Sequence, residues 1–200
     1  MAITTVIFDI GNVLTDFCWE RHFMKLGFSP EIYEKVADAT VRSKAWGEFD
    51  RGIAEEDVLG MFIENDPSVE AEIRRMFSNI ADTIHMYDTT IPWIMDLKSK
   101  GYKVLVLSNL SNKTLSECEK DMKFLNYIDG GILSFRDGVV KPEPEIYRLL
   151  IERYFLNPEE CVFLDDRREN IEAARKFGMH GIVFTTREEA LKELEALGVK

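Results

Sequence analysis

Short apolar runs alternate with amphipathic segments along the second half of the chain. After about residue 90 the apolar runs have the length of strands, and prolines and glycines mark the ends of the segments with helical periodicity. The pattern predicts strands at residues 102–109, 130–135, 161–166 and 181–184, and helices at residues 89–101, 111–122, 146–155, 167–178 and 187–198. Such repeated strand and helix units are typical of a parallel sheet with helices on both faces. The sequence therefore predicts a Rossmann-like α/β fold.

The first half of the chain has a different pattern. The apolar run "ITTVIF" predicts a first strand that leads into Asp9, whereas the following residues contain helical segments and no convincing strand. We therefore expect a core domain made of residues 1–16 and 87–200, with residues 17–86 inserted after the first strand as a small helical cap. The first two strands of the core would be distant in sequence but neighbours in the sheet.

Composition and charge narrow the possible partners. The chain has 200 residues, 46% of them hydrophobic, and a net charge of −11, which argues against nucleic acid and anionic membranes as partners. Its apolar runs are far shorter than the ~20 residues of a membrane span, and its start has no basic leader, so we expect a cytoplasmic protein. We expect a monomer or a homodimer. The three cysteines and three histidines have no metal-site spacing. An anionic substrate would need local positive charge.

Polar residues follow the predicted strands at the point where each strand ends. They are Asp9 after the first strand, Ser108 and Asn109 after the second, Lys141 in a loop, and Asp165 with Asp166 after "CVFL". Taken singly, each has an ordinary alternative as a turn residue, a helix cap or a solvated charge. Because the carboxyl ends of parallel strands meet at one edge, these side chains would converge on one crevice. Three carboxylates there would repel one another, and an oxygen-binding cation such as Mg²⁺ would hold them.

Four motifs in this order resemble those of the haloacid dehalogenase superfamily of hydrolases. They are "VIFDIGNVL", "VLVLSN", "VVKPEPEIY" and "CVFLDDRRENIEAA", and together they cover nearly the whole chain. The helical insertion has the position of the family's small cap. The chain is especially similar to the branch that contains bacterial glucose-1-phosphate phosphatase and the N-terminal phosphatase domain of soluble epoxide hydrolase.

The resemblance implies a Mg²⁺-dependent phosphatase that acts on a small phosphomonoester, with a sugar phosphate favoured. Asp9 would attack phosphorus to give an aspartyl-phosphate, which water then hydrolyses. Mg²⁺ would be held by Asp9, by the backbone carbonyl of Gly11 and by Asp166.

Further roles follow from the same resemblance. Lys141 would neutralise phosphate charge and restrain Asp9, while Ser108 and nearby backbone N–H groups, with Asn109, would bind phosphoryl oxygens. Asp165 and Asn170 would orient the groups that contact the metal.

Gly11 departs from the pattern of many phosphatases in this family. They carry a second aspartate at this position, which protonates the leaving group, and its loss commonly costs ~10²- to 10⁴-fold in rate. Either the leaving group departs with little help, or another acid such as Asp16 substitutes, or the reaction is not phosphate hydrolysis. The alternatives are a 2-haloacid dehalogenase and a non-catalytic protein that binds a phosphate ligand.

The insertion should determine which substrate is bound. Its aromatic residues are Phe17, Trp19, Trp46 and Phe49. We expect Trp46 and Phe49 to contact a sugar ring, although such residues more often form the core of a helical bundle. The segment "WGEFDRG" resembles a loop between helices, from which Glu48 or Asp50 could meet sugar hydroxyls.

Overall fold

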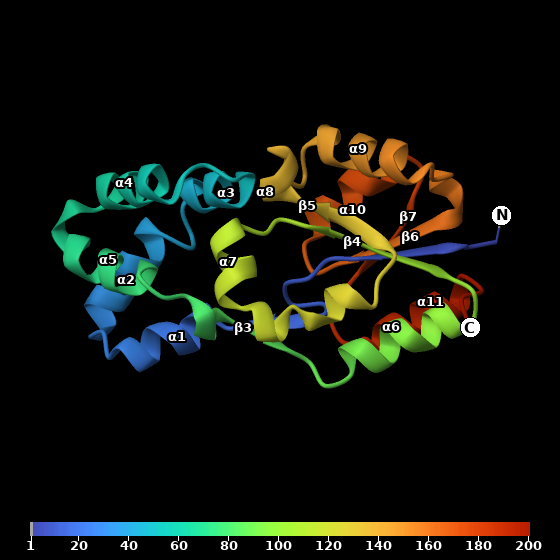
Figure 1. Ribbon diagram of the computed structural model, residues 1–200, viewed down its shortest axis with the longest axis horizontal. Coiled ribbons are helices and arrows are strands. Elements are labelled where there is room, and N and C mark those ends of the chain that lie inside the picture. The colour runs from blue at the N-terminus through green and yellow to red at the C-terminus, as the bar shows by residue number, and fades with distance from the viewer. Residues whose placement is uncertain (1) are drawn as a thin grey trace.

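A five-stranded parallel sheet forms the centre of the protein (Figure 1). The computed structural model describes residues 2–200. The strand order is β5-β4-β1-β6-β7, with β1 Thr5–Phe8, β4 Lys103–Ser108, β5 Gly130–Leu133, β6 Cys161–Asp165 and β7 His180–Val183. The central strand β1 pairs with β4 and β6, so that Ile7 lies beside both Leu105 and Phe163. This arrangement confirms the predicted α/β fold.

Two pairs of helices cover the two faces of the sheet (Figure 1). They are α6 Thr90–Ser99 and α11 Arg187–Ala196 on one face, and α9 Pro144–Tyr154 and α10 Arg168–Arg175 on the other. Alternate residues of β1 face opposite layers, because successive side chains of a strand point to opposite sides. Val6 and Phe8 pack in the layer of α6 and α11, whereas Ile7 packs in the layer of α9 and α10.

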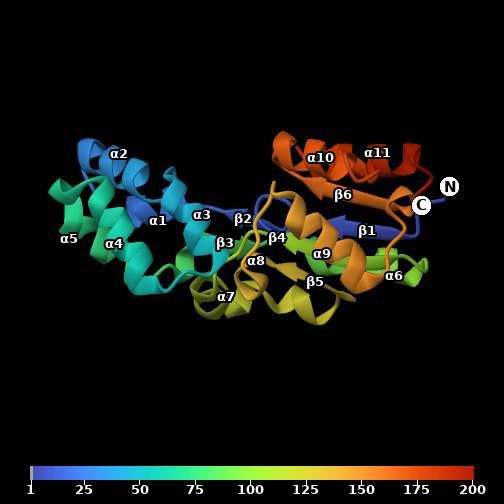
Figure 2. The ribbon, with the colours of Figure 1, turned by 90° about the horizontal axis from the view of Figure 1, so that it is seen from above.

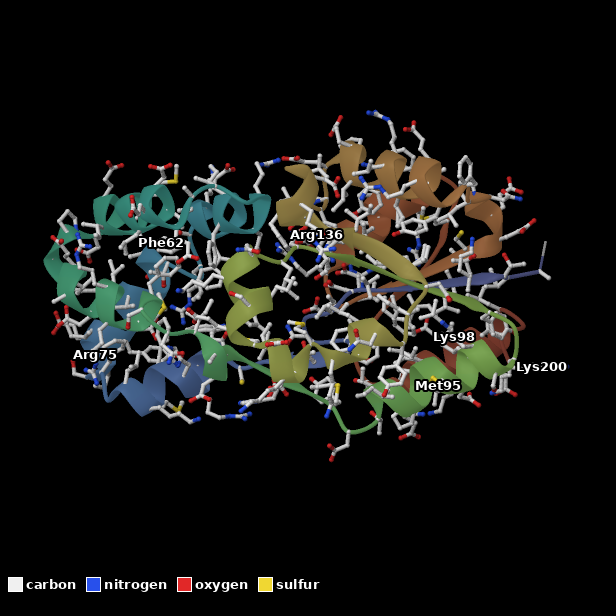
Figure 3. The ribbon with its side chains drawn as sticks, in the orientation of Figure 1. Phe62, Arg75, Met95, Lys98, Arg136 and Lys200 are labelled. Carbon is white, nitrogen blue, oxygen red and sulfur yellow. The ribbon has the colours of Figure 1, made fainter. Side chains whose placement is uncertain are left out.

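Helices α1–α5 form a second cluster beyond the carboxyl ends of the strands (Figures 1 and 2). They are α1 Trp19–Leu26, α2 Pro30–Ala39, α3 Lys44–Arg51, α4 Glu55–Asn65 and α5 Glu70–Phe77. This cap has its own apolar core, in which Phe62 is fully buried while Arg75 lies on the outer surface (Figure 3).

Two expectations about the region between residues 16 and 86 were wrong. The chain enters and leaves the cap through two short antiparallel strands, β2 Thr15–Phe17 and β3 Ile84–Met86 (Figure 2). Three residues are too few to show an alternating pattern, so pairing between distant segments forms these strands. Residues 46–51 are part of α3 and not a loop, because Trp46 and Phe49 pack along one side of the helix. Gly52, with φ of +95°, ends it in the left-handed conformation.

The remaining elements are short. Helix α7 Asn112–Glu117 is shorter than the predicted segment 111–122, and α8 Ser134–Asp137 begins where the predicted strand 130–135 was expected to continue. Single 3₁₀ turns occupy Pro67–Val69, Ala81–Thr83, Glu119–Asp121, Lys123–Asn126 and Pro158–Glu160. Among residues 2–200, no helix has the length and apolar character needed to cross a bilayer.

Candidate active site

Asp9 follows β1 and lies at the edge of the sheet that faces the cap. Its side chain is nearly buried, and Oδ1 accepts hydrogen bonds from the Ile10 N–H at 2.7 Å and from Lys141 Nζ at 2.8 Å. Within residues 2–200, Oδ2 has no hydrogen-bond partner. Burial raises the pKa of Asp9 to about 7, the nearby Asp165 and Asp166 add to this, and Lys141 opposes it. One oxygen is therefore fixed and the other is free to react.

Lys141 is buried between two carboxylates. Its Nζ lies 2.8 Å from Asp9 Oδ1 and 2.7 Å from Asp165 Oδ2. Asn170 Nδ2 contacts both Asp165 oxygens at 3.0 Å, and the Arg167 N–H donates to Oδ1 at 2.8 Å. Burial alone would lower the pKa of Lys141, but the two carboxylates outweigh it and raise the pKa. Asp165 and Asn170 therefore hold Lys141 charged and in place beside Asp9.

Asn109 fixes the backbone of the loop that carries Lys141. Its Oδ1 accepts from the Lys141 N–H at 2.7 Å, and its Nδ2 donates to the Lys141 carbonyl at 3.0 Å. Asn109 also lines the cavity, and its carboxamide keeps a second N–H, so its contact with substrate stays a prediction. Within residues 2–200, the Ser108 hydroxyl makes only a long contact of 3.4 Å with the Asn109 carbonyl.

Asp9, Asp165 and Asp166 form a cluster that can hold a cation. One oxygen from each lies within 4.8 Å of the others, and no histidine belongs to the cluster. Lys141, Asn170 and the Arg167 N–H engage both oxygens of Asp165. Asp9 and Asp166 are therefore the carboxylates that can supply metal ligands. A single lysine does not balance three carboxylates, and the raised pKa of Asp9 reflects burial and this repulsion. These residues therefore fit a hard divalent cation.

A cavity of about 250 Å³ separates the cluster from the cap. Its core side includes Asp9, Gly11, Ser108, Lys141 and Asp166, together with Arg167 and Asn170. Its cap side includes Val41, Trp46 and Asp50, with Phe17 at the hinge. The residues expected at the ends of three strands therefore line one cavity.

The structure separates the aromatic residues of the insertion into two groups. Trp46 lines the cavity and stacks on Phe62, with ring centroids 6.0 Å apart. Phe49 is 2% exposed within the cap core, and Trp19 packs against Phe23. Phe49 therefore does not reach the cavity, and the expectation that it contacts substrate is corrected.

The family of the chain follows from comparison with known proteins. A model of the haloacid dehalogenase-like hydrolases matches residues 3–178. The chain belongs to this family. The four motifs described above therefore identified the family correctly.

Several known proteins are similar to this chain in sequence. Phosphatase MT3486 of Mycobacterium tuberculosis is 24% identical over 99% of this chain and 96% of its own length. Bifunctional epoxide hydrolase 2 of Sus scrofa is 27% identical over 98% of this chain but 39% of its own length. Acyl-CoA dehydrogenase family member 10 of Mus musculus is 37% identical over 52% of this chain and 10% of its own length. The chain thus spans a minor part of the two larger relatives.

Solved structures of haloacid dehalogenase-like hydrolases share the fold. A hydrolase of Porphyromonas gingivalis aligns with a TM-score of 0.75 and 19% identity over 100% of both chains. The enzyme BT-2542 of Bacteroides thetaiotaomicron, solved with magnesium and inorganic phosphate, aligns with a TM-score of 0.70 and 21% identity over 93% of this chain and 96% of its own.

Asn12 is a site residue to which the sequence analysis gave no role. Its Nδ2 donates to Asp166 Oδ2 at 2.9 Å, and its Oδ1 accepts from the Phe17 N–H at 3.2 Å. Its φ of +59° is one that asparagine tolerates better than most residues. In this hydrolase Asn12 therefore connects a candidate metal ligand to the hinge of the cap. The Gly-Asn pair at positions 11 and 12, shortly after the strand-ending acid Asp9, was the available signal.

Proposed function

We propose that this hydrolase is a Mg²⁺-dependent phosphatase that cleaves a small phosphomonoester, with a sugar phosphate as the favoured class. The observation that carries the proposal is the state of Asp9. Its Oδ1 is held by Lys141 and a backbone N–H, while Oδ2, which has no hydrogen-bond partner within residues 2–200, lies beside the cavity. A carboxylate held in this way is suited to act as a nucleophile.

The residues of the chain divide the work of phosphoryl transfer. Asp9 Oδ2 attacks phosphorus while the bond to the leaving oxygen breaks, and water then cleaves the aspartyl-phosphate and regenerates Asp9. Lys141 offsets the charge of the phosphoryl oxygens from a position already fixed by Asp165. The weakly engaged hydroxyl of Ser108 donates to a phosphoryl oxygen.

The carboxylates of Asp9 and Asp166, with the carbonyl of Gly11, would hold Mg²⁺, and the cation would neutralise phosphoryl charge. The magnesium and phosphate bound to BT-2542, a protein of the same fold, support this choice. The orientation of Asp166 depends on the hydrogen bond from Asn12.

The cavity supports a small polar substrate. Its volume of about 250 Å³ is below the ~300–1,000 Å³ usual for drug-sized ligands, so a single sugar ring is a suitable size. Trp46 presents an aromatic surface to the cavity, and Phe17 lies nearby with its ring centroid 6.1 Å from that of Trp46. Aromatic faces of this kind pack well against sugar rings.

A dehalogenase is the second candidate, because Gly11 offers no acid and displacement of a halide needs none. The carboxylate cluster argues against it, since such a reaction uses no cation and gains nothing from three neighbouring aspartates. A non-catalytic phosphate-binding protein would not require the free Oδ2 of Asp9.

The test is phosphate release from a panel of phosphomonoesters, led by sugar 1-phosphates and 4-nitrophenyl phosphate, with Mg²⁺ or with a chelator. We expect release that requires Mg²⁺ and is lost in Asp9→Asn, while circular dichroism shows both proteins folded. Absence of release from every member, with the fold intact, would contradict the proposal. Chloride release from 2-chloropropionate would then identify the dehalogenase.

A further inference from the structure

The proposed reaction needs a proton donor that the core domain does not supply at the expected position. As a phosphomonoester is cleaved, the leaving oxygen develops negative charge, and an alkoxide departs slowly unless it is protonated. Gly11 has no side chain, and the alternative acid, Asp16, does not line the cavity. Instead Asp16 forms an ion pair with Arg21 at 2.8 Å.

Asp50 is the carboxylate that the cap contributes to the cavity. It lies near the end of α3, is partly buried, and lines the same cavity as Asp9 and Lys141. Among residues 2–200, nothing forms a hydrogen bond or an ion pair with its carboxylate. Glu48, the other acidic residue of α3, is turned to Arg51 at 3.4 Å and does not line the cavity. Asp50 is therefore an acid without a side-chain partner among the described residues, in the wall of the cavity that also holds Asp9.

Contacts on both sides fix Asp50 relative to the core domain. The Ser134 hydroxyl donates to the Asp50 carbonyl at 2.5 Å. The next residue, Arg51, donates to both carboxylate oxygens of Glu143, at 2.6 and 2.9 Å. Gly52 follows, and a Cβ there would come within 2.6 Å of the Phe135 carbonyl, so the backbones are in close contact. The end of α3 is thus fastened to α8 and to the start of α9.

We propose that Asp50 is the general acid and base of the phosphatase, in place of the aspartate missing at Gly11; this assignment rests on the function proposed above. The carboxyl group of Asp50 gives its proton to the leaving oxygen as the bond from phosphorus to that oxygen breaks. The resulting carboxylate then takes a proton from water as the water oxygen attacks the aspartyl-phosphate. The bond from phosphorus to Asp9 Oδ2 breaks, and both aspartates return to their starting states.

The electrostatic surroundings of Asp50 support this role. Burial raises its pKa to about 7, and the charge of Asp9 adds to the effect, while Lys141 and Arg167 act in the opposite direction. A carboxyl group with this pKa is present in both protonation states at neutral pH, as an acid and base must be.

The experiment compares two leaving groups in Asp50→Asn, an isosteric change. With a sugar 6-phosphate, whose alkoxide needs a proton, kcat/KM should fall ~10²- to 10⁴-fold. With 4-nitrophenyl phosphate, whose leaving group departs unaided, kcat/KM should change less than about 3-fold, because the first chemical step needs no acid. The same variant should release a burst of 4-nitrophenol, since hydrolysis of the aspartyl-phosphate lacks its base.

Two further variants serve as controls. Asp57→Asn makes the same change at an exposed carboxylate of the cap and should leave kcat/KM for both substrates unchanged. Gly11→Asp, added to Asp50→Asn, should raise kcat/KM for the sugar phosphate at least about 10-fold, because it supplies a new acid. A side chain fits at this position, since a Cβ at Gly11 would meet only Phe17 Cβ at 3.9 Å.

The outcomes separate this inference from the proposed function. An inactive wild-type protein would refute the phosphatase itself. If the wild type is active and Asp50→Asn lowers kcat/KM for both substrates by the same factor, or for neither substrate, the assignment of Asp50 alone is overturned.

Discussion

Replacing Lys141 with methionine tests whether the buried charges of the site depend on one another. The Lys141 side chain is 1% exposed and the Asp165 side chain is fully buried, so Lys141→Met leaves a carboxylate without its cation in a site closed to water. Removing one partner of a buried ion pair typically costs ~3–5 kcal/mol of folding free energy. For a chain of this size, that corresponds to a decrease in melting temperature of roughly 6–20 °C.

The loss should depend on pH, because Asp9 can take up a proton when Lys141 is absent. Burial has already raised the pKa of Asp9 from 3.8 to about 7, and Lys141 is the group that opposes the rise. In the variant the folded state therefore binds more protons than the unfolded state over an even wider range above pH 3.8. Stability must then fall as the pH rises through that range. We expect the destabilisation to be larger at pH 8 than at pH 5 by at least about 1.4 kcal/mol, the equivalent of one pKa unit.

Urea unfolding followed by circular dichroism, at both pH values and in the presence of a chelator, measures this difference. Lys100→Met is the matched control, since Lys100 forms an exposed ion pair with Asp96 at 2.6 Å. Its loss should cost less than about 1 kcal/mol at either pH. A destabilisation by Lys141→Met that is equal at pH 5 and pH 8, or no larger than that of Lys100→Met, would refute the reasoning.

Three other substitutions address the metal, the cap and the balance between stability and function. Asn12→Gly removes the hydrogen bond to Asp166 while it keeps the positive φ of this residue. Mg²⁺ binding should weaken ~10- to 100-fold by isothermal titration calorimetry, while circular dichroism shows the variant folded. Glu143→Gln weakens the contact with Arg51 that holds the cap against the core domain. Because this ion pair is partly exposed, KM should rise only ~2- to 5-fold in steady-state assays. An unchanged KM would show that the contact does not hold the cap in place. Asp50→Asn should stabilise the metal-free protein by on the order of 1–3 kcal/mol at pH 8 and by less at pH 5. The reason is that the pKa of Asp50 is raised in the folded state, so its ionised form, which prevails at pH 8, opposes folding. Equal urea midpoints for variant and wild type at pH 8 would contradict this.

The core domain was predictable because its signals are local and its topology is constrained. The three central strands β1, β4 and β6 contain continuous apolar runs, and parallel strands must place their carboxyl ends at one edge. The meeting of Asp9, Lys141 and Asp165 in a single ion-pair network follows from that geometry. The partners of Asn109 could not be predicted, because a residue at a strand end can turn its carboxamide to substrate or to backbone with equal ease.

The side-chain directions in the cap could not be predicted from such local signals. Its helices were visible in the sequence, but the direction of each side chain depends on how the bundle is oriented above the core. Trp46 and Phe49 lie three residues apart on one helix, yet only Trp46 lines the cavity. The orientation is set by contacts between distant segments, above all Arg51 with Glu143 and Ser134 with the Asp50 carbonyl. None of these pairs has a signature in a single sequence. The sequence could name Asp50 as a candidate for the acid missing at Gly11. Only the packing of α3 on α8 could place Asp50 in the cavity that also holds Asp9.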